Sequence, residues 1–230
     1  MWSDSAEMAF ADRTEAGRKL AALLAGYANR ADVIVLGIPR GGVQVAVEVA
    51  AQLSVPLDVF LLRKLGIPGE EELAFGAIAS GDVRILDRET IEALGISEQE
   101  IEQVTNAEQS ELQRRERAYR GSRPALDVQG KTVIFVDDGI ATGSSMRAGI
   151  KALRLLQPRR IVVAVPVAPA RTCNQLRSEV DELVCVRTPM FFHAIGQFYE
   201  DFTQVSDEEV LALLSSGQGS ALKKAAGGSC

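Results

Sequence analysis

Short runs of apolar residues alternate along this chain with segments whose apolar positions recur every three or four residues. The runs 33–38, 57–62, 133–136, 161–167 and 183–186 contain very few polar side chains, which is typical of strands buried on both faces. Segments with helical spacing follow most of these runs. This alternation predicts an α/β protein with a doubly wound, mostly parallel sheet and helices on both faces.

The middle of the chain has a different pattern. Residues 73–79 and 83–86 are strand-like and flank a Ser-Gly-Asp turn, which predicts a hairpin or an edge strand. Ser97 with Glu100 forms a capping box that opens a long charged helix, which we expect to run to about Tyr119.

We expect a single domain over residues 1–214. Ser206 with Glu209 opens its last helix. Residues 215–230 are rich in Gly, Ser and Ala and are expected to form a flexible tail.

Composition and charge narrow the class of protein. The 230 residues are 47% hydrophobic and 24% charged, as in globular proteins, and the net charge of −6 argues against a nucleic acid held on a basic surface. The three cysteines have no metal-ligand spacing and fit a reducing cytosol. With no signal-peptide pattern and no apolar run of about 18 residues, we expect a soluble, cytoplasmic protein without a membrane partner.

The stretch 133–145, Val-Ile-Phe-Val-Asp-Asp-Gly-Ile-Ala-Thr-Gly-Ser-Ser, carries the clearest chemistry. A buried strand ends in Asp137 and Asp138, and a loop rich in glycine and hydroxyl groups then opens a helix. Unpaired backbone N–H groups at a helix start suit a phosphate, whereas paired carboxylates suit sugar hydroxyls or Mg²⁺ held through water. An ordinary strand-to-helix turn is the alternative, but it needs fewer of these groups.

This stretch resembles the 5-phosphoribosyl-1-pyrophosphate (PRPP) motif of the type I phosphoribosyltransferases. The resemblance implies that Asp137 and Asp138 are catalytic, accept hydrogen bonds from the ribose and hold Mg²⁺ indirectly, together with PRPP. It also implies that the 5′-phosphate is bound by the loop Ala141, Thr142, Gly143, Ser144 and Ser145. Some purine-using members carry an aspartate where this chain has Ala141, which argues against that subgroup.

A second glycine-rich turn follows the run 33–38. Arg40, Gly41 and Gly42 combine a guanidinium with a helix start, a combination that suits pyrophosphate. In the resembled family the loop at this position cradles pyrophosphate. The alternative is a tight turn with Arg40 on the surface.

Arg63 and Lys64 follow the run 57–62, and Leu-Gly-Ile-Pro-Gly comes next. The resemblance implies a mobile lid here, with the basic pair reaching the pyrophosphate as catalytic charge. Alternatively, the pair caps a strand and binds the acidic run 70–72. Because ligands of doubly wound sheets sit beyond the carboxyl ends of the strands, we expect one cleft to gather both basic residues with Arg40 and the two aspartates.

Residues 188–205 contain five of the twelve Phe, Tyr and Trp residues of the chain. The resemblance implies a hood that covers the acceptor, with Phe191, Phe192 and His193 as acceptor-binding candidates. Packing of these aromatics onto the sheet is the alternative, and a lone histidine is more often structural. Any general acid or base would be sought in His193 or in the acidic run 70–72.

The resemblance implies Mg²⁺-dependent transfer of a phosphoribosyl group from PRPP to a small nitrogenous acceptor, a nucleobase-like ring, with pyrophosphate released. It is compatible with a homodimer. A PRPP- or nucleotide-sensing regulator on the same fold is the alternative, because such proteins keep the motif. A dinucleotide-binding domain is disfavoured, since no Gly-x-Gly-x-x-Gly follows any strand.

Overall fold

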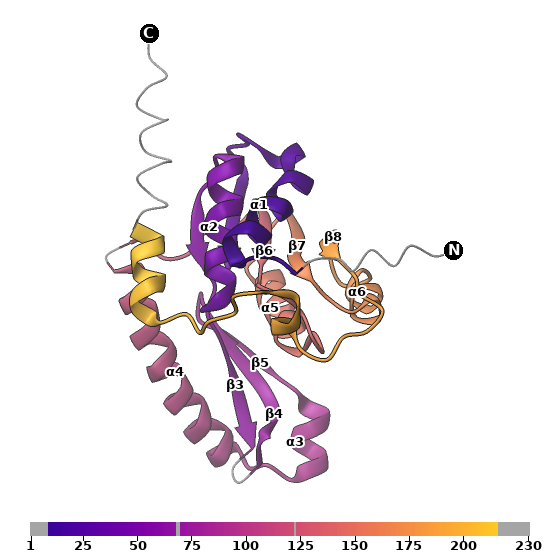
Figure 1. The fold of residues 1–230 in the computed structure, drawn as a ribbon. Helices are drawn as coiled ribbons and strands as arrows, with labels where there is room; N and C mark the ends of the chain where they lie inside the picture. Colours follow the sequence, from indigo (N-terminus) through magenta and orange to yellow (C-terminus); the bar gives the residue numbers. More distant parts are fainter. Residues whose placement is uncertain (1–8, 68–69, 122, 216–230) are drawn as a thin grey trace.

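The computed structural model describes residues 9–67, 70–121 and 123–215. Its centre is a parallel sheet with the strand order β2-β1-β6-β7-β8 (Figure 1). The strands are β1 (Val33–Gly37), β2 (Leu57–Val59), β6 (Thr132–Val136), β7 (Arg160–Val167) and β8 (Glu182–Arg187). The predicted doubly wound sheet with helices on both faces is confirmed.

Alternate residues of each strand feed two hydrophobic cores, because successive side chains of a strand point to opposite faces. On one face, Val33 and Val35 pack with residues of α1 (Arg13–Leu23) and α2 (Gly41–Leu53). The short helix η1 (Ala25–Tyr27) follows α1.

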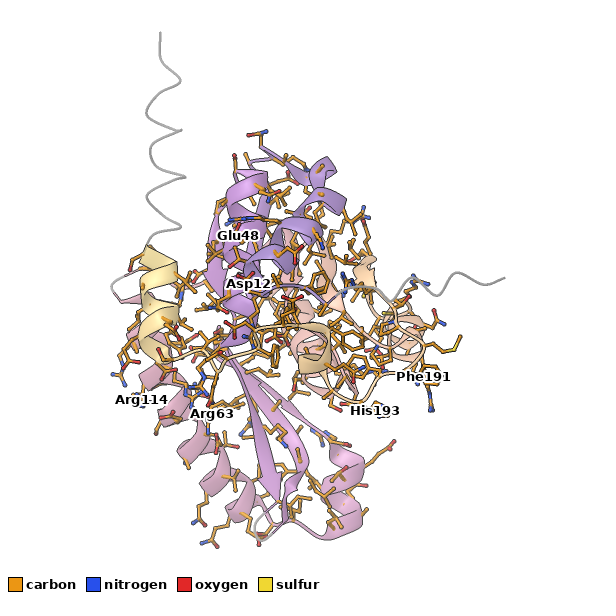
Figure 2. The ribbon with its side chains drawn as sticks, viewed as in Figure 1. Asp12, Glu48, Arg63, Arg114, Phe191 and His193 are labelled. Carbon is orange, nitrogen blue, oxygen red and sulfur yellow. The ribbon has the colours of Figure 1, made fainter. Side chains whose placement is uncertain are left out.

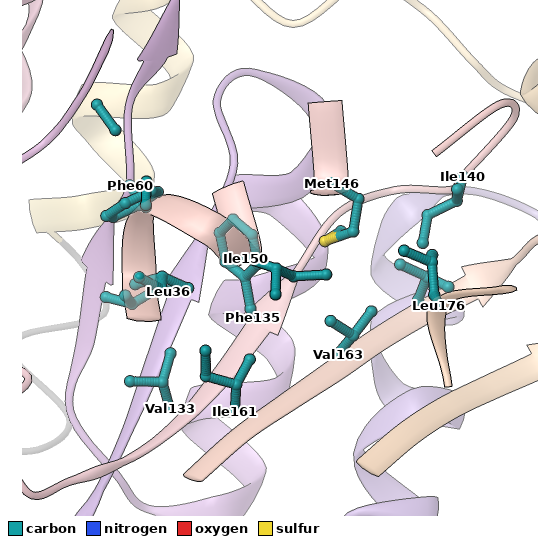
Figure 3. Close-up of a cluster of buried hydrophobic side chains, with 14 of the residues drawn as sticks. Leu36, Phe60, Val133, Phe135, Ile140, Met146, Ile150, Ile161, Val163 and Leu176 are labelled. Carbon is teal, nitrogen blue, oxygen red and sulfur yellow. The ribbon is translucent and has the colours of Figure 1, made fainter. Parts of the chain in front are cut away.

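The other face of the sheet packs against α5 (Ser144–Leu155) and α6 (Ala170–Leu176). Leu36, Phe135 and Ile150 are part of this second core (Figure 3). The two cores hold the sheet between helix layers, so its carboxyl edge is a fixed platform for the loops that follow the strands.

A second sheet with the order β3-β4-β5 lies beside the first, in the part of the molecule below it in Figure 1. Its antiparallel strands are β3 (Leu62–Ile67), β4 (Glu70–Ala79) and β5 (Val83–Leu86), followed by the helices α3 (Arg88–Leu94) and α4 (Glu98–Arg120). The predicted hairpin is confirmed as β4 and β5. The capping box is confirmed as well, with reciprocal bonds between Ser97 and Glu100 of 2.9 and 3.3 Å.

The prediction of one strand over residues 57–62 is wrong. The strand β2 stops at Val59, and the chain passes through Phe60 and Leu61 into β3 of the other sheet. Both linking residues are buried, and Phe60 packs edge-on against Phe135 with ring centroids 5.5 Å apart. The hydrophobic pattern does not reveal this change of sheet, because the linking residues stay buried and the apolar run is unbroken.

The basic pair therefore lies inside β3 rather than at the end of a strand of the parallel sheet. The predicted flexible loop is also corrected in part, since Leu65, Gly66 and Ile67 pair with β4 through an irregular register. Residues 68–69 and the side chains of the acidic run 70–72 lie outside the described part of the chain. Of the tail predicted over 215–230, residues 216–230 lie outside it as well.

The N-terminal end of the described chain pairs with a segment near residue 199. Phe10 forms an isolated parallel bridge with Tyr199, and its backbone N–H donates to the Phe198 carbonyl at 2.8 Å. The short helix η2 (Ile195–Phe198) precedes this bridge, and residues 207–215 form a last helix. Among the described residues, no helix has the length and apolarity needed to cross a bilayer.

Candidate functional site

Neighbouring strands bring the two glycine-containing loops together. Residues of β1 and β6 are paired up to Gly37 and Val136, and the N–H of Ile38 donates to the Val136 carbonyl at 2.9 Å. The turn 39–42 therefore begins beside Asp137 and Asp138, as the sequence predicts for these two loops.

The first turn of α2 packs directly onto the two aspartates, and glycine is what permits it. A Cβ atom on Gly41 would lie 2.0 Å from Oδ2 of Asp138, and one on Gly42 would lie 2.8 Å from Cα of Asp137. A side chain at either position would displace the acidic pair. Arg40, the N-cap residue of α2, follows a cis peptide bond from Pro39 and has an exposed side chain.

The carboxylates of Asp137 and Asp138 differ in their surroundings. Asp137 Oδ1 accepts the N–H of Asp138 at 2.9 Å, and Asp138 Oδ2 accepts Nε–H of Arg13 at 2.8 Å. Burial raises the pKa of Asp137 well above its usual range, and the neighbouring charge of Asp138 adds to the rise. Burial also raises the pKa of Asp138, although the Arg13 guanidinium opposes the shift. The ionised form of both carboxylates is therefore disfavoured in the ligand-free protein, and a bound cation or hydrogen-bond donor would stabilise it.

The loop after the acidic pair encloses a pocket of about 190 Å³ at the start of α5. Gly143 adopts φ of +82°, a left-handed conformation that favours glycine, and turns the chain into the helix. The Thr142 and Ser144 hydroxyls are exposed and 3.2 Å apart. All five residues predicted for the 5′-phosphate, 141–145, line this pocket together with Asp137. The exposed hydroxyls and the helix start make it suited to a phosphate group.

Arg63 and Lys64 do not lie at an end of the parallel sheet, so that part of the prediction is wrong. Both line a groove of about 720 Å³ between β3 and α4, and Arg63 forms an ion pair with Glu108 of that helix. Figure 2 shows Arg63 beside α4. An arginine within an antiparallel strand takes its partner from the packed helix, which no local sequence pattern reveals.

Two of the three predicted acceptor-binding residues, Phe191 and His193, lie at the outer part of the hood (Figure 2). Phe191 is 76% exposed and His193 is exposed, whereas Phe192 packs against Phe198 with ring centroids 5.3 Å apart. The hood instead reaches the phosphate pocket through Ile195, which also contacts Gly139.

Sequence reasoning missed Arg13, Tyr199 and Thr172. Arg13 reaches Asp138 across 125 positions, and the Tyr199 hydroxyl donates to the Asp138 carbonyl at 2.6 Å. Thr172 of α6 donates to the Ala141 carbonyl. Each contact depends on the folded arrangement of distant segments, so the only local signal was Asp12, which caps α1 and thereby fixes where Arg13 begins the helix.

The donor set fits a cation that is held together with a ligand. Within residues 9–67, 70–121 and 123–215 no cluster of three or more His, Cys, Asp or Glu side chains could hold a metal alone. Magnesium commonly binds through one or two carboxylates, waters and substrate phosphates. Asp137 and Asp138 offer two carboxylates of that kind, between two loops that each open a helix.

Comparison with known proteins agrees with this geometry. The sequence model described as "Phosphoribosyl transferase domain" matches residues 10–203. Two Mycobacterium tuberculosis proteins named "Putative phosphoribosyl transferase", MT0597 of strain CDC 1551 and Rv0571c of strain H37Rv, are each 43% identical over 205 residues, or 89% of this chain. The matched region is 46% of each of them, so the chain spans about half the length of these curated relatives.

A solved structure is similar over nearly its whole length. The protein TT1426 from Thermus thermophilus is 40% identical, with a TM-score of 0.79, and the match covers 91% of this chain and 99% of that one.

Proposed function

Because this chain belongs to the phosphoribosyltransferase family, we propose that it transfers the 5-phosphoribosyl group of PRPP to a nitrogenous acceptor and releases pyrophosphate. One observation carries the proposal: two carboxylates lie between two helix N-termini that each suit an anion. PRPP has the same order of groups, with ribose hydroxyls between a 5′-phosphate and a pyrophosphate.

In this proposal the loop 141–145 binds the 5′-phosphate through the backbone of α5 and its hydroxyl groups. Asp137 and Asp138 accept hydrogen bonds from the ribose hydroxyls. Arg40, which is exposed, and the N–H groups of the α2 start bind the pyrophosphate.

Mg²⁺ would be held by Asp137 and Asp138 through water and by the bound pyrophosphate, where it would supply positive charge against the leaving group. The remaining positive charge comes from the chain itself. Arg40 would neutralise the departing pyrophosphate, and we propose the same task for Arg63 and Lys64 after a movement of the β3–β4 hairpin.

In the transfer step, a lone pair of the acceptor nitrogen forms a bond to C1 of the ribose. The bond from C1 to the pyrophosphate oxygen breaks, and its electron pair leaves with pyrophosphate. The protein's contribution is to hold the reactants in line and to stabilise the charges that develop, and no covalent intermediate is needed. Phe191, Phe192 and His193 remain candidates for the acceptor side of the site.

A screen of nucleobases and related rings for PRPP-dependent release of pyrophosphate tests the proposal. We expect release with at least one acceptor, dependent on Mg²⁺ and strongly reduced in Asp138→Asn. Saturable PRPP binding without release for any acceptor would instead favour a PRPP-sensing regulator.

A further inference from the structure

Arg13 is a buried arginine at the acidic pair. It is the first residue of α1, its side chain is 8% exposed, and its Nε–H donates to Oδ2 of Asp138 at 2.8 Å. The Asp138 side chain is 13% exposed. A buried ion pair is weak evidence for stability, because desolvation of both charges offsets their attraction. The position of this pair at the proposed ribose site therefore calls for another explanation.

The guanidinium of Arg13 is fixed by groups other than Asp138. Its Nη1–H donates to the Thr203 carbonyl at 2.9 Å, and its Cζ lies 3.9 Å from the ring centroid of Phe202. Asp12 caps the helix by accepting the N–H of Glu15 at 2.7 Å, which sets the place of Arg13. Thr203 and Phe202 therefore fix the guanidinium, and the Asp12 cap fixes the start of the helix. Together they hold Nε of Arg13 at one position.

Asp138 is fixed in turn at its backbone and at one carboxylate oxygen. The Tyr199 hydroxyl holds its carbonyl, while Oδ2 is enclosed between Arg13 and the space that a Cβ on Gly41 would fill. Oδ1 of Asp138 and Oδ2 of Asp137 form no hydrogen bond with any residue in the described part of the chain. One free oxygen on each of two adjacent carboxylates matches the two vicinal hydroxyls of a ribose.

We propose that Arg13 is a positioning residue of the phosphoribosyl site: it orients the Asp138 carboxylate so that its free oxygen accepts a ribose hydroxyl. This inference rests on the proposed function. It also assigns a role to the strap 198–203, which supplies Phe202 and Thr203 and thereby connects the C-terminal segment to ribose recognition.

Calorimetric titration with ribose 5-phosphate and with inorganic phosphate separates ribose recognition from phosphate recognition. Arg13→Met removes the guanidinium but keeps an apolar stem, Arg13→Lys keeps the charge, and Arg18→Met is the matched control. Arg18 lies on the same helix, and its side chain, which forms an ion pair with Glu48, is 62% exposed. A thermal melt of each variant confirms that it is folded.

We expect Arg13→Met to bind ribose 5-phosphate about tenfold more weakly, the scale of one charge-assisted hydrogen bond, while inorganic phosphate binding changes less than about twofold. Arg13→Lys should recover part of the loss, and Arg18→Met should match the wild type. Equal losses for both ligands, or no loss in the folded Arg13→Lys and Arg13→Met variants, would overturn the positioning role. Failure of the wild type to bind PRPP or ribose 5-phosphate would instead overturn the proposed function itself, and this inference with it.

Discussion

The hydroxyl of Thr172 donates a hydrogen bond to the backbone carbonyl of Ala141 at 2.9 Å. This bond ties the start of α6 to the loop that encloses the phosphate pocket. The methyl group of Thr172 also lies 3.0 Å from the place where a Cβ on Gly143 would be. The loop is therefore shaped from outside as well as by its own residues.

Thr172→Val tests that support, because valine keeps the shape and removes the donor. We expect ribose 5-phosphate to bind roughly three- to tenfold more weakly, the range of one neutral hydrogen bond. Ser178→Ala is the control. Ser178 lies just beyond α6 and donates an exposed hydrogen bond to the Gln175 carbonyl, so its loss should leave binding as in the wild type. Unchanged affinity in Thr172→Val, measured by calorimetry, would show that the loop holds its shape unaided.

Arg40→Ala tests the assignment of the pyrophosphate site. Because charge-assisted hydrogen bonds contribute about 1.5–3 kcal/mol, pyrophosphate should bind roughly ten- to a hundredfold more weakly. Ribose 5-phosphate, which lacks the pyrophosphate, should bind almost unchanged. Equal losses for the two ligands would place Arg40 outside the pyrophosphate site.

Arg63→Ala and Lys64→Ala test whether the β3–β4 hairpin acts as a lid. Interactions formed only in the transition state lower turnover without weakening ground-state binding, so we expect kcat to fall strongly and PRPP affinity only modestly. Single-turnover rates beside equilibrium binding make this comparison.

Glu108→Gln is the control for the Arg63 variant, since it breaks the same ion pair but leaves the arginine in place. Turnover should persist in Glu108→Gln. If the glutamine variant lost turnover as severely as Arg63→Ala, the ion pair rather than the arginine's charge would be what matters.

Asp137→Asn tests whether the buried charge of Asp137 destabilises the ligand-free protein. The pKa of Asp137 is raised in the folded state, so the folded state binds more protons than the unfolded state above about pH 4, and the ionised carboxylate lowers stability as the pH rises. Asparagine keeps the acceptor for the Asp138 N–H and removes the charge. The variant should therefore have a higher Tm than the wild type at pH 7, and the difference should shrink towards pH 4.

The same Asp137→Asn variant should bind PRPP with Mg²⁺ more weakly, which is the usual exchange of stability for function at a site. A Tm at pH 7 equal to or below that of the wild type would contradict the strain that we infer from the shifted pKa.

Local sequence signals were enough for the parts of the site that one segment builds alone. The strand β6, its two aspartates and the start of α5 follow one another without interruption, so hydrophobic pattern and loop chemistry predict them together. The turn at Gly41 and Gly42 was predictable for the same reason. Its contact with Asp138 followed from the rule that carboxyl ends of parallel strands share an edge.

Contacts that depend on distant packing were not predictable. The run 57–62 looks continuous because Phe60 and Leu61 stay buried as the chain changes sheets. Arg63 pairs with Glu108 on α4, which is 45 positions away in the sequence. Arg13 pairs with Asp138, which is 125 positions away. In both cases tertiary packing determines the partner, and the residues adjacent in sequence do not indicate it.

Calorimetric titration of PRPP in the presence of Mg²⁺ tests the central assignment most directly. We expect saturable binding of PRPP that is tighter than that of ribose 5-phosphate, because only PRPP has groups for both proposed anion-binding loops. Asp138→Asn should weaken this binding while the ligand-free variant stays folded. The absence of binding at millimolar PRPP with Mg²⁺, or PRPP binding that is indifferent to Asp138→Asn, would contradict the assignment.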